Sequence, residues 1–313
     1  MSEYIFKRIE KNVYHDIRTL YTRSFYSKRS MEYMYKKYNT SFFGLSDIGY
    51  IAYDKNDSPA AYYGVFPIII SINSKDVLVA QSGDTMTDPE HRKKGLFTKL
   101  ALMTYELAKN EGVKFVFGFP NKNSLPGFER KLNWEFYGNM KEFKIKTNAF
   151  PLAEISSKSL FLRRIHKKYC KVILDSKIIN RSDSEISNIN FENPDSFIKK
   201  DTNFFNYKQF SSTFLIRYND FTIFIKPEVH LNIGAVEKFD KKRINDFIKT
   251  IKKLAFKLGC RKIVIPISKN HWLYSIISKN FNSKESIPIG FLRFSDEYRF
   301  ENISFIGSDY DTF

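Results

Sequence analysis

Two stretches of this chain repeat one pattern at a fixed distance. The segments are GVKFVFGFPNKN at 112–123 and GCRKIVIPISKN at 259–270, which places Gly112 and Gly259 147 positions apart. Asn133 and Asn280 have the same offset. Repeat architectures such as solenoids have periods of about 20–50 residues. A repeat of this greater length therefore indicates two tandem copies of one fold.

The same order of elements surrounds both segments. In the first copy, period-2 runs and turn signals predict the order β-α-β-β-β-α-β-α-β, with strands at 77–87 and 114–119 on either side of a helix from 94 to 110. In the second copy, a helix from 241 to 258 precedes a strand at 261–267. We expect an α/β fold of the α+β mixed-sheet type. The expected domains are residues 1–150 and 202–313, with a helical and polar connector at 151–201.

The charge of the chain allows two readings. The formal net charge is +17, which suits a polyanion such as nucleic acid. Abundant Lys, Asn, Ile, Phe and Tyr equally fit the composition of an A- and T-rich genome, and this is the reading we favour. On either reading, a basic surface attracts anionic small molecules such as nucleotides.

Other features bear on location and cofactors. The two cysteines, Cys170 and Cys260, lack the spacing of a metal site or a disulfide framework, which fits a reducing cytoplasm. No metal is expected. The N-terminus shows no secretory signal, and no apolar run reaches the roughly 18 residues of a membrane span. The sequence leaves the oligomeric state open, and a homo-oligomer is possible.

A basic, glycine-containing loop joins the strand at 77–87 to the helix that follows it. The loop is HRKKGLF at 91–97, with three consecutive cations before Gly95. The first amides of a helix have no partner inside it, and they point along the positive end of the helix dipole. A phosphate can accept hydrogen bonds from them, and glycine lets it approach closely. The second copy has KFDKKRI at the matching place, without the glycine.

The segment DPEHRKKGLFTKL resembles motif A of the GNAT (Gcn5-related N-acetyltransferase) superfamily, Arg/Gln-x-x-Gly-x-Gly/Ala. Phe97 stands where that motif has Gly or Ala. FVFGFPNKNSLPGFERKLNWEFYG resembles motif B. The resemblance covers about residues 3–146, and in the second half it is one of topology. It implies two GNAT-like domains, the second lacking the pyrophosphate loop, and an acyl-coenzyme A (acetyl or short acyl) bound where the fourth and fifth strands separate.

The resemblance also implies roles for particular residues. The Met86 amide would polarise the thioester carbonyl as an oxyanion donor. Asp84 would accept a proton from the amine or orient it. Phe128 stands where many relatives have a tyrosine acid, so the general acid is unassigned. The expected cofactor-binding residues are Met86, Thr87, Arg92, Lys93, Lys94, Gly95, Leu96, Phe97, Thr98, Asn121, Asn123 and Phe128.

The histidines and tryptophans give weaker signals. His230 and His271 are candidates for facing an acceptor, together with Asp84. We expect His91, His15 and His166 to be surface or solvated residues, and Trp134 and Trp272 to lie in cores.

The acceptor is inferred from the whole-chain plan. QSGDTM, IGSDYDTF and the tandem arrangement resemble the bacterial transferases that N-acylate dTDP-linked amino sugars for surface polysaccharides, including lipopolysaccharide, with the second copy as the acceptor wall. A protein, peptide or peptidoglycan-precursor amine is an alternative acceptor. Two non-enzymatic alternatives are a nucleic-acid-binding module, which the motifs do not support, and an acyl-coenzyme A sensor.

Overall fold

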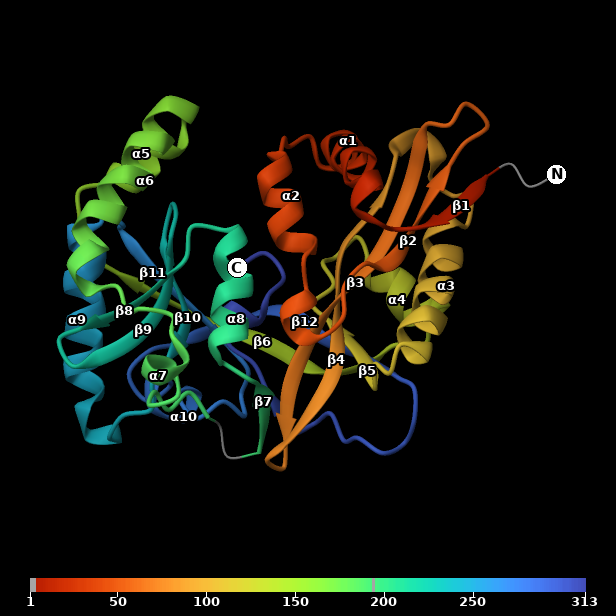
Figure 1. Ribbon diagram of the computed structural model, residues 1–313. Helices are drawn as coiled ribbons and strands as arrows, with labels where there is room; N and C mark the ends of the chain where they lie inside the picture. The colour runs from red at the N-terminus through yellow and green to blue at the C-terminus, as the bar shows by residue number, and fades with distance from the viewer. Residues whose placement is uncertain (1–3, 193–194) are drawn as a thin grey trace. The chain divides into compact units, whose positions relative to one another are not determined.

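The computed structural model describes residues 4–192 and 195–313 (Figure 1). Packing divides the chain into two compact units, each built from two segments: unit 1 is Met1–Gly138 with Pro288–Glu301, and unit 2 is Asn139–Ile287 with Asn302–Phe313. The chain passes from one unit to the other within two strands, β6 (Glu135–Lys146) and β12 (Ser283–Arg293), each of which begins in one unit and ends in the other. The expected consecutive domains, 1–150 and 202–313 with a connector at 151–201, stay a prediction; residues 1–3 and 193–194 lie outside the described residues.

Unit 1 is built on a mixed sheet. Its strands are β1 (Ile5–Arg8), β2 (Ile48–Tyr53), β3 (Pro59–Ile72), β4 (Lys75–Thr87), β5 (Phe115–Gly118) and the end of β12, in that order. β4 and β5 are parallel, and the other neighbours are antiparallel. The last pairing sets Gly290 opposite Gly118 and Arg293 opposite Phe115. The mixed α/β sheet expected from the sequence is therefore confirmed.

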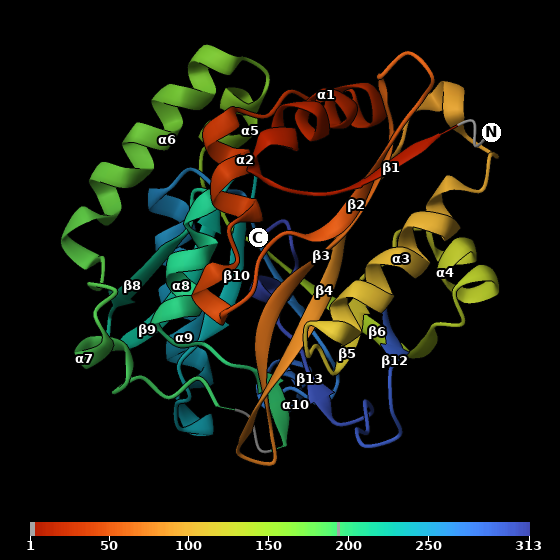
Figure 2. The ribbon, with the colours of Figure 1, turned by 45° about the vertical axis from the view of Figure 1, so that its right-hand side comes forward.

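Helices cover both faces of this sheet (Figure 2). The helices are α1 (Tyr14–Phe25), α2 (Met31–Tyr38), α3 (Leu96–Asn110) and α4 (Leu125–Lys131). Successive strand residues point to opposite faces. Accordingly, Tyr62 packs with α1 and α2, whereas Tyr63 packs with α3 and α4.

Unit 2 repeats the strand pattern of unit 1. Its sheet has the order β8-β9-β10-β11-β6, formed by β8 (Phe214–Tyr218), β9 (Phe221–Pro227), β10 (Leu231–Val236), β11 (Lys262–Ile267) and the end of β6. Only β10 with β11 is parallel among these pairs, as β4 with β5 is in unit 1. Gly112 and Gly259, the pair that defines the sequence offset, both adopt positive φ after a long helix, +88° and +67°. The structure thus fits two copies of one fold.

The remaining elements of unit 2 are helical or short. They are α5 (Leu152–Ser157), α6 (Leu160–Leu174), α7 (Asp183–Ile186), β7 (Ser196–Ile198), α8 (Thr202–Tyr207), α9 (Ile244–Lys257), α10 (Tyr274–Ile277) and β13 (Ile303–Ser304). α6 lies in the segment expected as a connector, and its Cys170 and Leu174 belong to the core of unit 2. Across residues 4–192 and 195–313, no helix combines the length and apolarity needed to cross a membrane.

The second copy lacks the glycine loop because its chain is shorter between the 3-10 helix and the long helix that follows. Asp88 and Asp240 each cap a short 3-10 helix, accepting from the amide two residues ahead. In unit 1 four residues, 92–95, then lead to α3; in unit 2 Arg243 ends the 3-10 helix and α9 begins at Ile244. The loop is therefore deleted, which an ungapped comparison of the two sequences does not reveal.

Candidate acyl-donor site in unit 1

The paired part of β4 and β5 is short. Their parallel register joins Ala80 with Val116 and Gln81 with Phe117, and β4 then continues to Thr87. A β-bulge lies in this extension, because Tyr62 is opposite Met86 while Gly64 is opposite Gly83. Bulges bend a strand and change the direction of its side chains. The bulge thus bends β4 beyond the part that is paired with β5, and the expected cleft between the two strands stays a prediction.

The direction of the backbone at the end of β4 determines which of its amides can donate a hydrogen bond to a bound molecule. The amide of Asp88 donates to the carbonyl of Ala60 at 2.9 Å, so it points toward β3. Amides alternate between the two edges of a strand. The amide of Met86 therefore also points toward β3, and that of Thr87 points to the other edge. The Met86 side chain is buried with Tyr62, and the expected role of its amide as oxyanion donor stays a prediction.

The glycine loop leads directly into α3. Lys93 and Gly95 adopt left-handed backbone conformations, with φ of 62° and 75°. The first helical hydrogen bond runs from the Lys99 amide to the Gly95 carbonyl at 3.1 Å. The amides of Leu96, Phe97 and Thr98 thus precede any carbonyl of the helix that they can bond. A Cβ added at Gly95 meets no atom within 4 Å, so the space beside these amides is open.

The three cations expected around this space are Arg92, Lys93 and Lys94, and all three are exposed. An exposed cation contributes attraction over about a Debye length rather than a fixed geometry. The loop thus combines backbone donors with exposed positive charge, a combination that suits a diphosphate.

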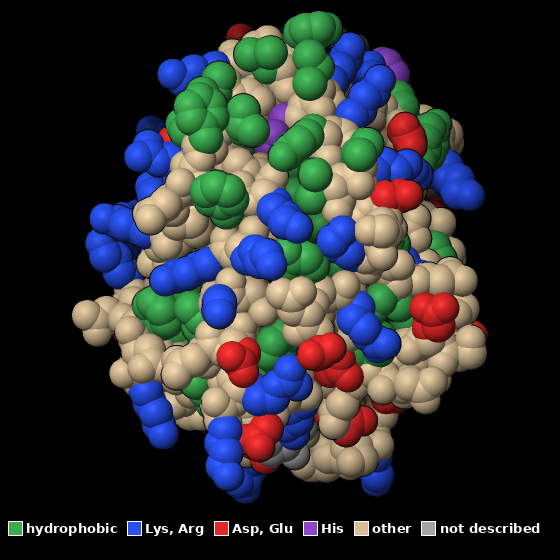
Figure 3. All heavy atoms as spheres, turned by 90° about the vertical axis from the view of Figure 1, so that its left-hand side faces the viewer, with side chains coloured by type: hydrophobic (Ala, Val, Ile, Leu, Met, Phe, Trp, Pro, Cys, Tyr) green, Lys and Arg blue, Asp and Glu red, His purple; other side chains and the backbone are tan. Residues whose placement is uncertain are grey.

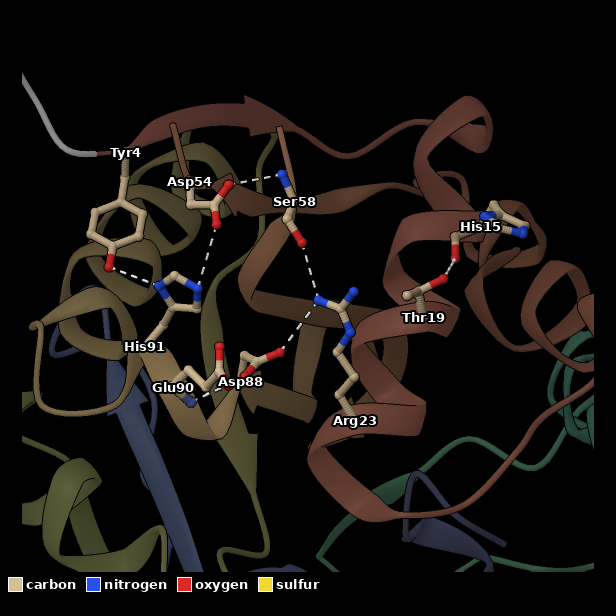
Figure 4. Close-up of polar contacts among 9 residues, drawn as sticks. All are labelled: Tyr4, His15, Thr19, Arg23, Asp54, Ser58, Asp88, Glu90 and His91. Carbon is tan, nitrogen blue, oxygen red and sulfur yellow. Dashed lines mark hydrogen bonds and ion pairs between the residues drawn. The ribbon is translucent and has the colours of Figure 1, made fainter. Parts of the chain in front are cut away.

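The turn before the loop is held by Asp88 (Figure 4). Its carboxylate accepts from the amide of Glu90 at 3.1 Å and from Arg23 Nη1 at 3.5 Å. Arg23 also donates to Ser58 Oγ at 3.1 Å, which ties α1 to the turn between β2 and β3. The turn that leads into the loop is therefore fixed to the framework of unit 1.

His91 supplies a second attachment, visible in the same view (Figure 4). Its Nδ1 lies 3.0 Å from Tyr4 Oη and its Nε2 lies 3.6 Å from Asp54 Oδ2. The expectation of a plain surface histidine is corrected: His91 is half-buried and connects the loop to β1 and to the β2–β3 turn. His15, by contrast, is exposed on α1, as expected.

Asp84 lies in the bulge of β4 and is part of a buried ion pair. Lys37 Nζ is 2.8 Å from Asp84 Oδ2, and the two side chains are 0% and 7% exposed. The Tyr38 hydroxyl donates to the same carboxylate at 3.3 Å. Burial raises the pKa of Tyr38 and of Tyr62 well above the ordinary value, so both remain protonated hydroxyl groups. The Asp84 carboxylate thus contacts both the Lys37 ammonium group and the Tyr38 hydroxyl.

Sequence reasoning missed Lys37. It lies in MEYMYKKY, where two adjacent lysines look like a solvated helix end. The helical period gives a usable signal, however, because Met34, Lys37 and Tyr38 fall on one face of α2, and all three are buried.

Phe97 and Phe128 pack together beneath the loop. Their ring centroids are 5.3 Å apart in an edge-to-face arrangement, and Phe97 also meets Tyr63 at 5.7 Å. Phe128 contacts Trp134 at 4.5 Å, and Trp134 is 4% exposed. Phe128 is thus a core residue here rather than a residue that presents a polar group to a substrate.

Gly127 accommodates the large residue at position 97. A Cβ at Gly127 would lie 2.9 Å from Phe97 Cε1. We expect Gly127→Ala to lower the free energy of unfolding by about 1–3 kcal/mol, as overpacking does, and Phe97→Leu to restore most of the loss. Urea unfolding of the two single variants and the double variant measures this; equal losses in Gly127→Ala with and without Phe97→Leu would contradict it.

Asn121 and Asn123 begin the turn into α4. Asn121 Oδ1 accepts from the amides of Asn123 and Ser124 at 2.9 and 3.1 Å. This is an Asx turn, which occupies the Asn121 side chain with a structural task. The side chain of Asn123 is exposed.

The expected acceptor histidines lie in unit 2. His230 is in the bend between β9 and β10, with its Nδ1 buried. His271 is 4% exposed, and its Nδ1 accepts from the amide of Leu273 at 3.2 Å. That burial leaves no surface on His271 for an acceptor amine.

His166 is also buried and lies 2.9 Å from the carbonyl of Leu258, which corrects its expected solvation. Trp272 packs against Phe239 at 5.2 Å, as expected of a core residue.

His271 gives a pH dependence of stability. Burial, followed by the charge of Lys200, lowers its pKa to about 3 from 6.5. Between these two values the unfolded chain binds a proton that the folded chain does not, so stability rises with pH through this window. We expect His271 to make the free energy of unfolding about 2 kcal/mol lower at pH 5 than at pH 7.5. His271→Asn keeps an acceptor for Leu273 and should abolish this part of the slope in urea unfolding at the two pH values; an unchanged slope would rule the assignment out.

Comparison with known proteins agrees with this geometry. The family described as acetyltransferase (GNAT) domain matches residues 6–137, a stretch that lies within unit 1. Among curated proteins, none matches the chain. Three solved structures share the fold over nearly the whole chain.

The first is a protein from Pyrococcus horikoshii assigned as an acetyltransferase, with 12% identity, a TM-score of 0.54 and coverage of 96% of this chain and 93% of that one. The second is a GCN5-related N-acetyltransferase from Kribbella flavida (11%, 0.56, 92% and 70%). The third is the N-myristoyltransferase of Saccharomyces cerevisiae with bound myristoyl-CoA (10%, 0.53, 93% and 82%).

Proposed function

We propose that this protein transfers an acyl group from acyl-coenzyme A to a primary amine, and that unit 1 binds the acyl donor. The observation that carries the proposal is the start of α3: three successive helix amides border an open space at Gly95, beyond the point where β4 leaves β5. The diphosphate of coenzyme A would accept from the amides of Leu96, Phe97 and Thr98. Arg92, Lys93 and Lys94 would add attraction for the phosphates.

The rest of the donor would follow β4. The Thr87 amide points away from β3, and β4 extends beyond its pairing with β5, so the end of β4 would suit the amide groups and the thioester carbonyl of the donor. An amide of this segment would stabilise the oxyanion that forms on attack. Asn123 and the turn formed by Asn121 would make up the opposite wall of the donor site.

The reaction is direct aminolysis. The amine nitrogen forms a bond to the thioester carbon, the carbon–sulfur bond breaks, and the thiol leaves. One proton leaves the amine and one reaches the sulfur. Bringing the reactants together supplies much of the rate. Asp84, paired with Lys37, would orient the incoming neutral amine and stabilise the positive charge that develops on its nitrogen as the bond forms.

For the acceptor, we propose an amino sugar carried on a nucleoside diphosphate. The support is chemical: a chain with a net charge of +17 attracts a dianionic acceptor and repels cationic ones. Surface-polysaccharide synthesis is the process that uses such acceptors.

The test has two parts. Thermal unfolding with coenzyme A, acetyl-coenzyme A and longer acyl-coenzyme A should show a rise in the melting temperature, since a ligand that binds the folded state stabilises it. Thiol release with a panel of nucleotide-linked amino sugars, peptides and peptidoglycan-precursor amines then identifies the acceptor. Donor binding with no release for any amine would assign the protein as an acyl-coenzyme A sensor instead. No donor binding, together with steeply salt-dependent binding of duplex DNA, would replace the enzyme proposal with nucleic-acid binding.

A further inference from the structure

Helix α6 of unit 2 exposes an unusual number of large apolar side chains. Phe161, Ile165 and Val172 are 69%, 48% and 75% exposed. They are spaced by four and seven residues, so they form one stripe along the helix. We call these three residues the apolar stripe. Figure 3 shows hydrophobic side chains gathered in the upper part of this face, with Lys and Arg side chains around them.

Other large apolar side chains of the neighbouring segments are exposed as well. Leu152 and Ile155 of α5 are 40% and 42% exposed, Phe150 before α5 is 66% exposed, and Phe256 of α9 is 60% exposed. Contiguous exposed apolar surface of this kind marks an interaction site more often than scattered single residues do.

The charges beside the stripe have one sign. Between residues 150 and 174 the only acidic residue is Glu154, and the basic residues are Lys158, Arg163, Arg164, Lys167, Lys168 and Lys171. These six side chains are all exposed. Arg164 and Lys168 flank the stripe directly by helical spacing. Long basic side chains can lie along apolar surface while their charged ends reach toward anions.

The helix is firmly attached through its other face. Its buried residues are His166, Cys170 and Leu174. The Tyr169 hydroxyl donates to the carbonyl of Lys257 at 2.7 Å, and the His166 imidazole meets the carbonyl of Leu258 at 2.9 Å. The apolar stripe is therefore presented on a fixed helix, and it is not a core face awaiting a partner within unit 2.

A basic groove runs along the side of the same helix. It has a volume of about 510 Å³, and its lining includes Lys167, Lys168, Lys171 and Arg181. Ser211, also in the lining, has a buried hydroxyl with no hydrogen-bond partner in the part of the chain that the structure describes. A phosphate oxygen entering the groove would supply such a partner.

We propose that α6 and its apolar stripe dock unit 2 onto the surface of an anionic phospholipid membrane. On its exposed side α6 presents aromatic and aliphatic residues next to a row of Lys and Arg, a combination that suits the interface of such a bilayer. Its basic residues are attracted by the negative headgroups. A second copy of this chain fits less well, because a two-fold interface would set the same cations of the two copies against each other. The proposal does not depend on the proposed acyl transfer.

The experiment is vesicle flotation of the full chain. Binding to mixed phosphatidylcholine–phosphatidylglycerol vesicles is expected, with little binding to pure phosphatidylcholine and a decrease at raised salt. Phe161→Ser with Val172→Ser, and separately Arg164→Gln with Lys168→Gln, should each reduce binding about ten-fold or more. Matched controls are Leu102→Ser, an apolar residue of α3 that is 56% exposed, and Lys241→Gln with Lys242→Gln at the start of α9; both should bind as the parent does.

Several results would overturn the proposal. Equal binding to neutral and anionic vesicles would remove the charge argument. Anionic binding that survives both sets of α6 substitutions would place the contact elsewhere. A concentration-dependent dimer in sedimentation velocity that Phe161→Ser with Val172→Ser abolishes, without vesicle binding by the parent, would assign the stripe to a second copy.

Discussion

Gly95→Asp is expected to weaken coenzyme A binding by about 100-fold while leaving the protein folded. The new side chain enters the open space beside the helix amides and brings a negative charge to the place proposed for the diphosphate. Losing charge-assisted hydrogen bonds costs about 1.5–3 kcal/mol, and 2.8 kcal/mol corresponds to about 100-fold. Asp tolerates a left-handed backbone, and an acidic side chain favours a helix N-terminus. Isothermal titration with coenzyme A measures the change.

Gly112→Asp is the matched control. Gly112 follows the other end of α3, has a φ of +88° and, like Gly95, has no atom within 4 Å of an added Cβ. It therefore repeats the backbone strain and the added charge without touching the proposed site. Equal affinity in Gly95→Asp and Gly112→Asp would remove the foundation of the acyl-donor proposal.

Lys37→Met is expected to destabilise the protein by about 3–5 kcal/mol. The substitution leaves Asp84 as a buried carboxylate without the ammonium group that lies 2.8 Å away, and breaking a buried ion pair from one side costs about that much. The double variant Lys37→Met with Asp84→Leu should lose less than the sum of the two single variants, because the lone buried charge is gone. Urea unfolding of the set gives the coupling energy.

The same variants separate a positioning role for Asp84 from a purely structural one. If Asp84 orients the amine, the double variant should regain stability without regaining turnover, and Asp84→Asn should raise KM for the acceptor more than for the donor. Turnover that follows stability across the whole set would reduce Asp84 to a structural residue. Lys36→Met, at the exposed neighbour of Lys37, is the control and should change neither quantity.

Local patterns predicted most of the fold. α3 begins at Leu96 and ends at Asn110 because its apolar residues recur at helical spacing and Gly95 precedes them, and the sequence shows both features. The offset between Gly112 and Gly259 likewise marked the two helix ends that share a positive φ. The GNAT-like loop was visible because its chemistry depends on backbone donors and a glycine, which a sequence states directly.

Features that depend on distant contacts were less accessible. The direction of an amide at the end of β4 depends on the pairing of Asp88 with Ala60, which the sequence does not state. Burial of Lys37 and attachment of His91 to Tyr4 and Asp54 arise from residues far apart in the chain. To see that the loop is deleted in the second copy, the two sequences must be aligned with a gap. The capping residues Asp88 and Asp240 mark where that gap belongs.

The pairing of β5 with the end of β12 also affects how the protein can be made. Unit 1 gains the edge strand 288–293 only after a ribosome has synthesised nearly the whole chain. Until then Phe115, Val116 and Phe117 would form an unprotected strand edge, which is prone to pairing with other chains. The first copy expressed alone, as residues 1–150, should therefore be recovered mainly as aggregates, and co-expression of the missing segment should rescue it.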